Sequence, residues 1–242
     1  MRSIHGMLAI AAALIAVPAI AAPATPARPA ADIANDAMRK PAAMVAFAQV
    51  KPGQTVVDLL PGAGYFTRVF SDAVGPGGKV IALLPEGLVK MRPQALSGMQ
   101  ALTKEPGRAN VAVSVTNMQS LAPAGTVDLV WTSRNYHDLH AASMPAGTVA
   151  AVNKAAFDAL KPGGLYVVLD HAAAPGSGLR DVSTLHRIDP AAVKQEVAAA
   201  GFRFDGESDA LVNKADDHSK AVFDPSLRGH TDQFVYRFRK PG

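Results

Sequence analysis

Two short segments hold most of the side chains that could carry out acid–base chemistry. SRNYHDLH contains Tyr136 and His137, and LDH contains Asp170 and His171. Each segment directly follows a short apolar run typical of a buried strand, and open α/β sheets bind their ligands at the carboxyl ends of such strands. Because imidazole titrates near neutral pH, we predict His137, Tyr136 and His171 as the candidate catalytic residues.

Neighbouring residues of a strand point to opposite faces, so Asp170 and His171 are not expected to act as one pair. Arg187 stands ahead of a helix that is expected to begin with Asp189 as its N-cap and Pro190 at its first position. A surface position is the expectation for Arg187, and the alternative is a clamp for an anionic acceptor.

Groups of histidine and aspartate residues also raise the question of a metal site. The candidates are the H-x-x-H pair His137 and His140, and a loop group of Asp216, Asp217, His218 and His230. The first pair lacks a third ligand nearby, and adjacent carboxylates in a turn-rich loop are commonly just solvated. We therefore expect no metal site, and metal-dependent hydrolysis ranks third among the functions considered.

The stretch VVDLLPGAGYFTR, residues 56–68, has the pattern of a strand, a tight turn and a helix start. Asp58 lies near the end of the apolar run, Gly62 and Gly64 lie in the turn, and Tyr65 opens the helix. Glycines in such a turn let a ligand approach the backbone N–H groups of a helix N-terminus. The dinucleotide fingerprint requires a third small residue, but Thr67 takes that position, which disfavours NAD and FAD.

Short apolar runs alternate with helical patterns along the chain. Strands are expected near 55–60, 79–84, 110–115, 126–133 and 165–170, with helices near 35–50, from 65, and near 86–104, 145–160 and 190–200. Runs buried on both faces and separated by helices indicate an α/β, doubly wound, mostly parallel sheet.

The end of the chain departs from this alternation. Two late strands, in 202–211 and 233–240, are joined by a loop without a helix, so they must pair antiparallel as a hairpin at the edge of the sheet. The loop, residues 212–232, is long enough to suggest a lid.

Six segments together resemble the class I S-adenosylmethionine-dependent methyltransferase family, and within it a bacterial branch of exported methyltransferases. They are DLLPGAGYFTR, GPGGKVIA, SRNYHDLH, LDHAAAPGSG, LHRIDP and ADDHSKAVFDPSLRGHTDQFVYRF. The resemblance implies a Rossmann-like, seven-stranded sheet with an antiparallel last strand slotted in. It also implies S-adenosylmethionine as the cofactor.

The resemblance further implies a set of cofactor contacts at the carboxyl ends of the first strands. The set comprises Asp58, Gly62, Gly64, Tyr65, Glu86, Asn117 and Asn135. Asp58 would support the turn that receives the methionine moiety, and Asn117 would sit near the adenine. The family has glycine where Leu60 stands and an acidic, ribose-binding residue where Leu84 stands, so Glu86 is the candidate to replace that acid.

Residues 1–21 have the features of a cleavable signal peptide. Arg2 precedes an apolar run, Pro18 breaks the run, and the small residues of A-I-A fit a cleavage site before Ala22. The run is about half of the roughly 20 residues that a membrane span needs. We therefore expect export to the periplasm, without stable membrane insertion after cleavage.

Composition places further bounds on the mature chain. Residues 22–34, rich in Ala and Pro, are expected to form a flexible lead-in, and 35–242 a single domain. There are no cysteines, so neither a disulfide framework nor a lipidated cysteine is available. The net charge of the full chain, +4, is spread along its length without a basic run, so no nucleic-acid partner is expected.

The leading functional hypothesis is an exported methyltransferase that acts on a small-molecule acceptor. The alternative is a non-catalytic ligand-binding protein that retains the same fold, which Leu60, Leu84 and the export signal favour. The sequence predicts neither the acceptor nor the oligomeric state.

Overall fold

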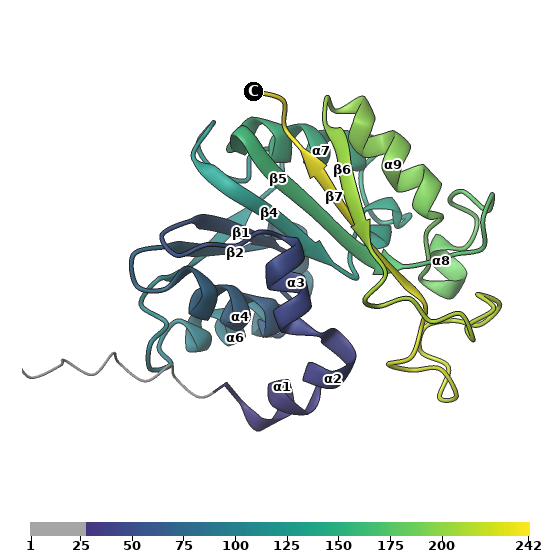
Figure 1. Ribbon diagram of the computed structural model, residues 1–242, viewed down its shortest axis with the longest axis horizontal. Coiled ribbons are helices and arrows are strands. Elements are labelled where there is room, and N and C mark those ends of the chain that lie inside the picture. Colours follow the sequence, from purple (N-terminus) through teal and green to yellow (C-terminus); the bar gives the residue numbers. More distant parts are fainter. Residues whose placement is uncertain (1–27) are drawn as a thin grey trace, which may run out of the picture.

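The computed structural model describes residues 28–242, so the expected signal peptide lies outside the described part of the chain. Figure 1 shows one sheet with helices on both of its faces. The strands are β1 (Thr55–Leu59), β2 (Lys79–Pro85), β3 (Val111–Thr116), β4 (Val127–Ser133), β5 (Leu160–His171), β6 (Arg203–Ser208) and β7 (Gln233–Arg239).

The helices begin and end as follows. They are α1 (Ala30–Ala34), α2 (Asp36–Arg39), α3 (Pro41–Phe47), α4 (Tyr65–Val74), α5 (Glu86–Met91), α6 (Pro93–Leu102), the 3-10 helix η1 (His137–His140), α7 (Thr148–Ala159), α8 (Val182–Leu185) and α9 (Pro190–Ala199). Asp189 is the N-cap of α9, and its side chain accepts a hydrogen bond from the Ala191 amide, as the sequence predicts.

The strand order is β3-β2-β1-β4-β5-β7-β6. β7 runs antiparallel to both β5 and β6, while the remaining neighbours are parallel. This confirms the doubly wound, mostly parallel sheet with an antiparallel last strand. β7 pairs with β5 and β6 forms the edge, so the expected hairpin at the edge of the sheet is confirmed, with β7 between β5 and β6.

The sheet has two hydrophobic cores, one on each face, because successive side chains of a buried strand point to opposite faces. In β1, Val57 and Leu59 pack into one core, and Val56 packs into the other. Helices α7 and α9 cover the first core, while α3, α4 and α6 cover the second. Both faces of β1 are therefore buried, and only the carboxyl end of the strand is available for a ligand.

Two helices expected to be continuous are each interrupted before a proline. Lys40 has φ 43° before Pro41, which separates α2 from α3, and Arg92 has φ −137° before Pro93, which separates α5 from α6. Proline disfavours the helical conformation of the residue that precedes it. The interruptions thus follow from the steric effect of each proline on the residue before it. The spacing of apolar residues alone does not reveal them.

The other differences from the sequence expectation lie at glycines and at the N-terminus. α7 begins at Thr148 because Gly147 has φ 81°, and the KPGG segment, expected to end this helix, belongs to β5. The expected flexible lead-in is helical over Ala30–Ala34, where Asp32 pairs with Arg68 at 3.3 Å. This segment, which its Ala- and Pro-rich composition predicts to be a flexible lead-in, is thus partly helical and forms an ion pair with α4.

Candidate functional site

The candidate site lies where the strand order changes direction, between β1 and β4. Ligands of doubly wound sheets bind in the crevice outside the strand ends at this point. The turn after β1 has three residues with left-handed backbones, Leu60 at φ 59°, Gly62 at φ 58° and Gly64 at φ 83°. Leu60 therefore keeps the backbone conformation that glycine adopts most easily.

The two turn glycines serve different purposes. A Cβ atom placed on Gly62 would meet nothing within 4 Å, whereas one on Gly64 would lie 2.3 Å from Leu102 Cδ1. Gly64 is thus required for the approach of α6 to the turn. Gly62 is exposed and leaves open space beside the backbone, which is what a bound ligand would need.

Asp58 is buried beneath this turn. The Thr67 hydroxyl donates a hydrogen bond of 2.6 Å to its Oδ2 atom, so Thr67 supports the carboxyl group. Burial raises the pKa of Asp58 to about 7, although the Thr67 hydrogen bond and the charge of Arg39 act in the opposite direction. Asp58 therefore changes its charge close to neutral pH.

Tyr65 is turned toward the N-terminal helices. Its hydroxyl donates a hydrogen bond of 2.6 Å to Asp36 Oδ1, and the Arg39 guanidinium lies 4.5 Å from its ring centroid. Burial and the bond to Asp36 raise the pKa of Tyr65 to about 12. Tyr65 thus joins α2 to the start of α4 through its hydroxyl group, a contact different from the cofactor contact expected from the sequence.

Arg68 stabilises the glycine turn after β1, a role that the sequence did not suggest. It binds both carboxylate oxygens of Glu105, at 2.8 and 2.6 Å, and donates a hydrogen bond of 3.0 Å to the Ala63 carbonyl. Together with the pair to Asp32, these contacts tie α1, the glycine turn and the loop after α6 to one side chain.

The ends of β2 and β3 carry the remaining expected cofactor contacts. Leu84 is buried in the core, so no carboxylate stands at that position of β2. Glu86 is exposed as the first residue of α5. Asn117 is also exposed, and its side-chain oxygen accepts a hydrogen bond from the Gln119 amide.

Asn135 bridges the crevice. Its amide group donates to the Leu60 carbonyl at 2.8 Å and to the Ser133 carbonyl at 2.7 Å. It thereby joins the turn after β1 to the end of β4. The side chain thus binds backbone across the predicted cofactor crevice.

His137 and Asp170 form a pair that the sequence analysis missed. Asp170 Oδ1 lies 2.8 Å from His137 Nδ1, and Asp170 Oδ2 accepts a hydrogen bond from the His137 amide at 2.8 Å. Both side chains are buried. Burial disfavours the imidazolium ion, but the Asp170 charge outweighs this effect, and the pKa of His137 lies above its usual value.

Desolvation would raise the pKa of Asp170, yet the paired histidine keeps it below the usual value. A signal for this pair existed in the sequence, because His137 follows one apolar run by a few residues and Asp170 ends another. Ser133, the last residue of β4, lies opposite Leu169 of the parallel strand β5, so η1, which begins at His137, starts at the same edge of the sheet as Asp170. The prediction that Asp170 and His171 would not act as a pair is consistent with this arrangement.

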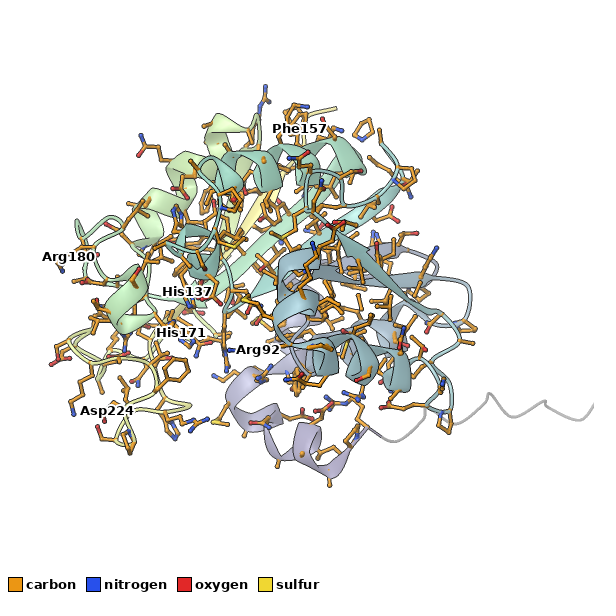
Figure 2. The ribbon with its side chains drawn as sticks, turned by 180° about the vertical axis from the view of Figure 1, so that it is seen from behind. Arg92, His137, Phe157, His171, Arg180 and Asp224 are labelled. Carbon is orange, nitrogen blue, oxygen red and sulfur yellow. The ribbon has the colours of Figure 1, made fainter. Side chains whose placement is uncertain are left out.

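His171 and Tyr136 have different environments from His137. The ring centroids of His137 and His171 lie 6.2 Å apart, and Figure 2 shows both near the middle of the molecule. Burial lowers the pKa of His171 to about 3, so its imidazole is neutral, with Nδ1 2.7 Å from the Thr231 hydroxyl.

Tyr136 is fully buried, and its hydroxyl binds Asn153 at 2.8 Å and Glu196 at 3.0 Å. These contacts direct the hydroxyl into the core beside α7 and α9. The catalytic role predicted for Tyr136 does not fit this position.

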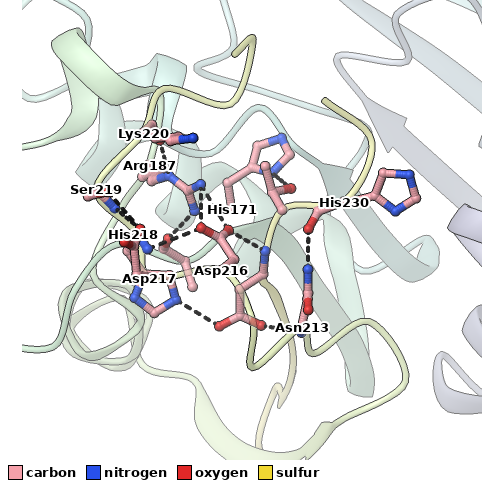
Figure 3. Close-up of polar contacts among 12 residues, drawn as sticks. His171, Arg187, Asn213, Asp216, Asp217, His218, Ser219, Lys220 and His230 are labelled. Carbon is pink, nitrogen blue, oxygen red and sulfur yellow. Dashed lines mark hydrogen bonds and ion pairs between the residues drawn. The ribbon is translucent and has the colours of Figure 1, made fainter. Parts of the chain in front are cut away.

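The loop of residues 209–232 is held by a buried ion pair (Figure 3). Arg187 and Asp216 have fully buried side chains and meet at 3.1 and 2.9 Å, and Arg187 also donates to the Ala172 and Lys220 carbonyls. The surface position expected for Arg187 is therefore wrong. His218 binds Asp232 at 2.9 Å and Asp217 binds Ser219, so three of the four loop residues considered as metal ligands make internal contacts, while His230 is exposed.

A cavity of about 530 Å³ opens beside η1 and not at the glycine turn. Its walls come from η1, the segment 141–147, α7 and α9, and they include His140, Asn153 and Glu196. His140 Nε2 lies 3.2 Å from Glu196 Oε2, so His140 faces this cavity and not His137. The two histidines of the H-x-x-H motif thus lie in two different environments.

No family model matches this chain. The ubiquinone/menaquinone biosynthesis C-methyltransferase UbiE of Hydrogenovibrio crunogenus is 30% identical over 128 residues, which cover 52% of this chain and 45% of that protein. This chain thus matches about half of the length of that relative.

Solved structures match over a larger share of the chain. An S-adenosylmethionine-dependent methyltransferase from Aquifex aeolicus has a TM-score of 0.60 and 20% identity, over 86% of this chain and 93% of that one. The [4+2]-cyclase SpnF has a TM-score of 0.63 and 15% identity, over 84% of this chain and 81% of its own. The protein therefore has the Rossmann-like fold of the S-adenosylmethionine-dependent methyltransferases.

Proposed function

We propose that this protein binds S-adenosylmethionine and transfers its methyl group to a small-molecule acceptor. The observation that carries the proposal is the turn after β1, with left-handed backbone at Leu60 and open space at Gly62, at the switch point of the sheet. The similarity to UbiE and to the Aquifex aeolicus enzyme supports this cofactor.

His137 is the residue that we propose to face the acceptor. Asp170 fixes the His137 ring through Nδ1, which leaves Nε2 as the atom able to exchange a proton with an acceptor. Methyl transfer displaces a thioether from a sulfonium carbon, so the protein has mainly to align the two reactants. One positioned imidazole is sufficient for such a reaction.

Export to the periplasm is a further part of the proposal. It rests on the signal-peptide features of residues 1–21, which lie outside the described residues. Within residues 28–242, none of the helices combines the length and the apolar character needed to cross a membrane.

Isothermal titration calorimetry with S-adenosylmethionine and with its demethylated product tests the cofactor assignment. Gly62→Arg fills the open space beside the turn and is expected to weaken binding at least tenfold, which corresponds to about 1.4 kcal/mol. Gly125→Arg is the matched control. Gly125 also has a left-handed backbone, at φ 67°, and open surroundings, but it precedes β4 at the opposite end of the sheet.

Equal loss of affinity in both variants would assign the effect to backbone strain and contradict the site. Absence of binding at millimolar ligand would contradict the cofactor itself. Binding of the cofactor without transfer to any acceptor would instead favour the alternative of a ligand-binding protein with this fold.

A further inference from the structure

Three side chains from two separate elements converge beside the His137–Asp170 pair. His137 and Asp138 begin η1, and His186 follows α8. His137 Nε2 lies 3.4 Å from Asp138 Oδ1, and His186 Nδ1 lies 3.9 Å from the same oxygen. We propose that these three residues bind a divalent transition-metal cation such as Zn²⁺ or Co²⁺.

The spacing of the candidate ligand atoms fits such an ion. One ligand atom from each residue lies within 4.8 Å of the other two. Tetrahedral ligands at 2.0–2.2 Å from a zinc ion are separated from one another by about 3.4 Å. Only a small adjustment of exposed side chains is needed to reach this separation.

The surroundings of His137 match those of a histidine ligand. Metal-binding histidines usually donate their second ring N–H to a carboxylate, which fixes the ring and the tautomer. Asp170 holds His137 in this manner through Nδ1, at 2.8 Å, and directs Nε2 toward Asp138. Asp170 would therefore be a positioning residue for the cation.

His186 is held by the chain on both of its sides. It has a left-handed backbone at φ 54°, and the next residue, Arg187, is fixed by the buried pair with Asp216. The Phe223 ring packs against the imidazole with a centroid distance of 4.9 Å. The position of His186 thus depends on the loop 209–232 as well as on α8.

The site can admit both an ion and a further ligand. The side chains of His186 and Asp138 are 38% and 52% exposed, whereas His137 is buried. Three protein ligands leave at least one coordination position open, as in catalytic zinc sites. Two imidazoles and one carboxylate suit zinc, cobalt and iron better than calcium or magnesium.

A consequence for catalysis rests on the methyl transfer proposed above. A hydroxyl acceptor bound to the cation would lose its proton to solvent more easily, as metal-bound water does. The acceptor oxygen would then bond to the methyl carbon, and the carbon–sulfur bond would break with its electron pair left on sulfur. With the cation bound, His137 Nε2 would be a metal ligand, and the cation would replace the proton exchange proposed above for this atom.

Titration of the full, untagged protein with Co²⁺ and with Zn²⁺, after treatment with a chelator, tests the site without any methyl donor. Visible absorption of Co²⁺ and calorimetry with Zn²⁺ are each expected to show one saturable ion per chain. His186→Asn, which tolerates the left-handed backbone, and Asp138→Asn should each weaken binding at least about tenfold, the lower end of losses known for outer-shell changes.

His230→Ala is the control, because His230 is an exposed histidine outside this cluster. It should bind both ions as the unaltered protein does, and circular dichroism should show that all variants are folded. Unsaturable binding in the unaltered protein, or unchanged affinity in His186→Asn, would overturn the proposal. Since no S-adenosylmethionine is present, either result leaves the methyltransferase assignment to its own test.

Discussion

At the scale of single residues, Asp58 gives the protein a specific dependence on pH. Its pKa is raised to about 7 in the folded protein, while an unfolded chain has about 3.9. Between these values the folded state holds a proton that the unfolded state has released, so stability falls as pH rises toward 7. From about pH 5 to about pH 7, this group should lower the free energy of unfolding by about 2 kcal/mol.

Asp58→Asn removes this titration and keeps a group able to accept the Thr67 hydrogen bond. We therefore expect the variant to lose less stability than the unaltered protein across that pH range. Urea unfolding at both pH values, without cofactor, measures the difference. The same pH dependence in both proteins would contradict the raised pKa, because all other titrating groups are shared.

Glu86 decides whether a carboxylate still reaches the ribose hydroxyls of the proposed cofactor. Leu84 is buried in the core and offers no polar atom, whereas Glu86 is exposed two residues later. If Glu86 accepts from the ribose, Glu86→Gln should weaken binding of S-adenosylmethionine by about 1.5–3 kcal/mol, the range for hydrogen bonds to charged groups. Calorimetry compares this variant with Glu207→Gln, an exposed acid on β6 at the far edge of the sheet. Equal affinity in both variants would exclude Glu86 from the cofactor site.

At the scale of elements, the loop 209–232 depends on one buried ion pair. Arg187 and Asp216 are both fully buried, so Arg187→Met leaves an uncompensated carboxylate. Removing one partner of such a pair typically costs about 3–5 kcal/mol. We expect faster tryptic cleavage after Lys214 and Lys220 in Arg187→Met, and a lower midpoint of urea unfolding.

Two further variants test this interpretation of the loop. Asp217→Asn alters the neighbouring exposed carboxylate, which bonds locally to Ser219, and should leave the cleavage rate unchanged. The double variant Arg187→Met/Asp216→Leu removes both charges and should recover part of the lost stability. If the double variant is cleaved as fast as Arg187→Met, charge burial is not the cause.

The strands could be predicted from the sequence, whereas the ion pair that holds the loop 209–232 could not. The central strands β1, β2, β4 and β5 follow from apolar runs, because strands buried on both faces are apolar at nearly every position. The ion pair that holds the loop 209–232 could not be predicted, because Arg187 and Asp216 are distant in sequence and an arginine is expected at the surface. Likewise, the breaks at Pro41 and Pro93 were readable from the residue before each proline, but apolar spacing alone extended both helices.

At the scale of the whole molecule, the glycine turn and the polar strand ends were located by sequence, but their partners were not. His137 was predicted without a carboxylate partner, and the structure pairs it with Asp170 because parallel β4 and β5 end at one edge. Tyr136 was grouped with His137 because the two are adjacent. The Tyr136 hydroxyl, however, points into the core, where it contacts Glu196 and Asn153. Adjacency in sequence was therefore a weaker guide to the site than adjacency of strands.

The position of the N-terminal helices constrains where a signal peptide could be removed. Arg28 pairs with Asp36, and Asp32 pairs with Arg68, so the folded protein uses side chains from residue 28 onward. Cleavage before Ala22 keeps both pairs, and we expect the periplasmic form to begin at Ala22 and to unfold at the same temperature as the uncleaved chain.

A chain that begins at Asn35 would lose both part-buried ion pairs, while Arg68 would keep its two hydrogen bonds to Glu105. The free energy of unfolding of this shorter chain should fall by about 1–3 kcal/mol, because hydrogen bonds to charged groups are lost. Intact-mass measurement on periplasmic fractions and thermal unfolding of the three forms check these expectations. Full-length chain confined to the cytoplasmic fraction would contradict export. Equal stability of the Asn35 form would instead show that α1 contributes little to the fold, and the ion pair between Asp32 and Arg68 would then be incidental to the glycine turn.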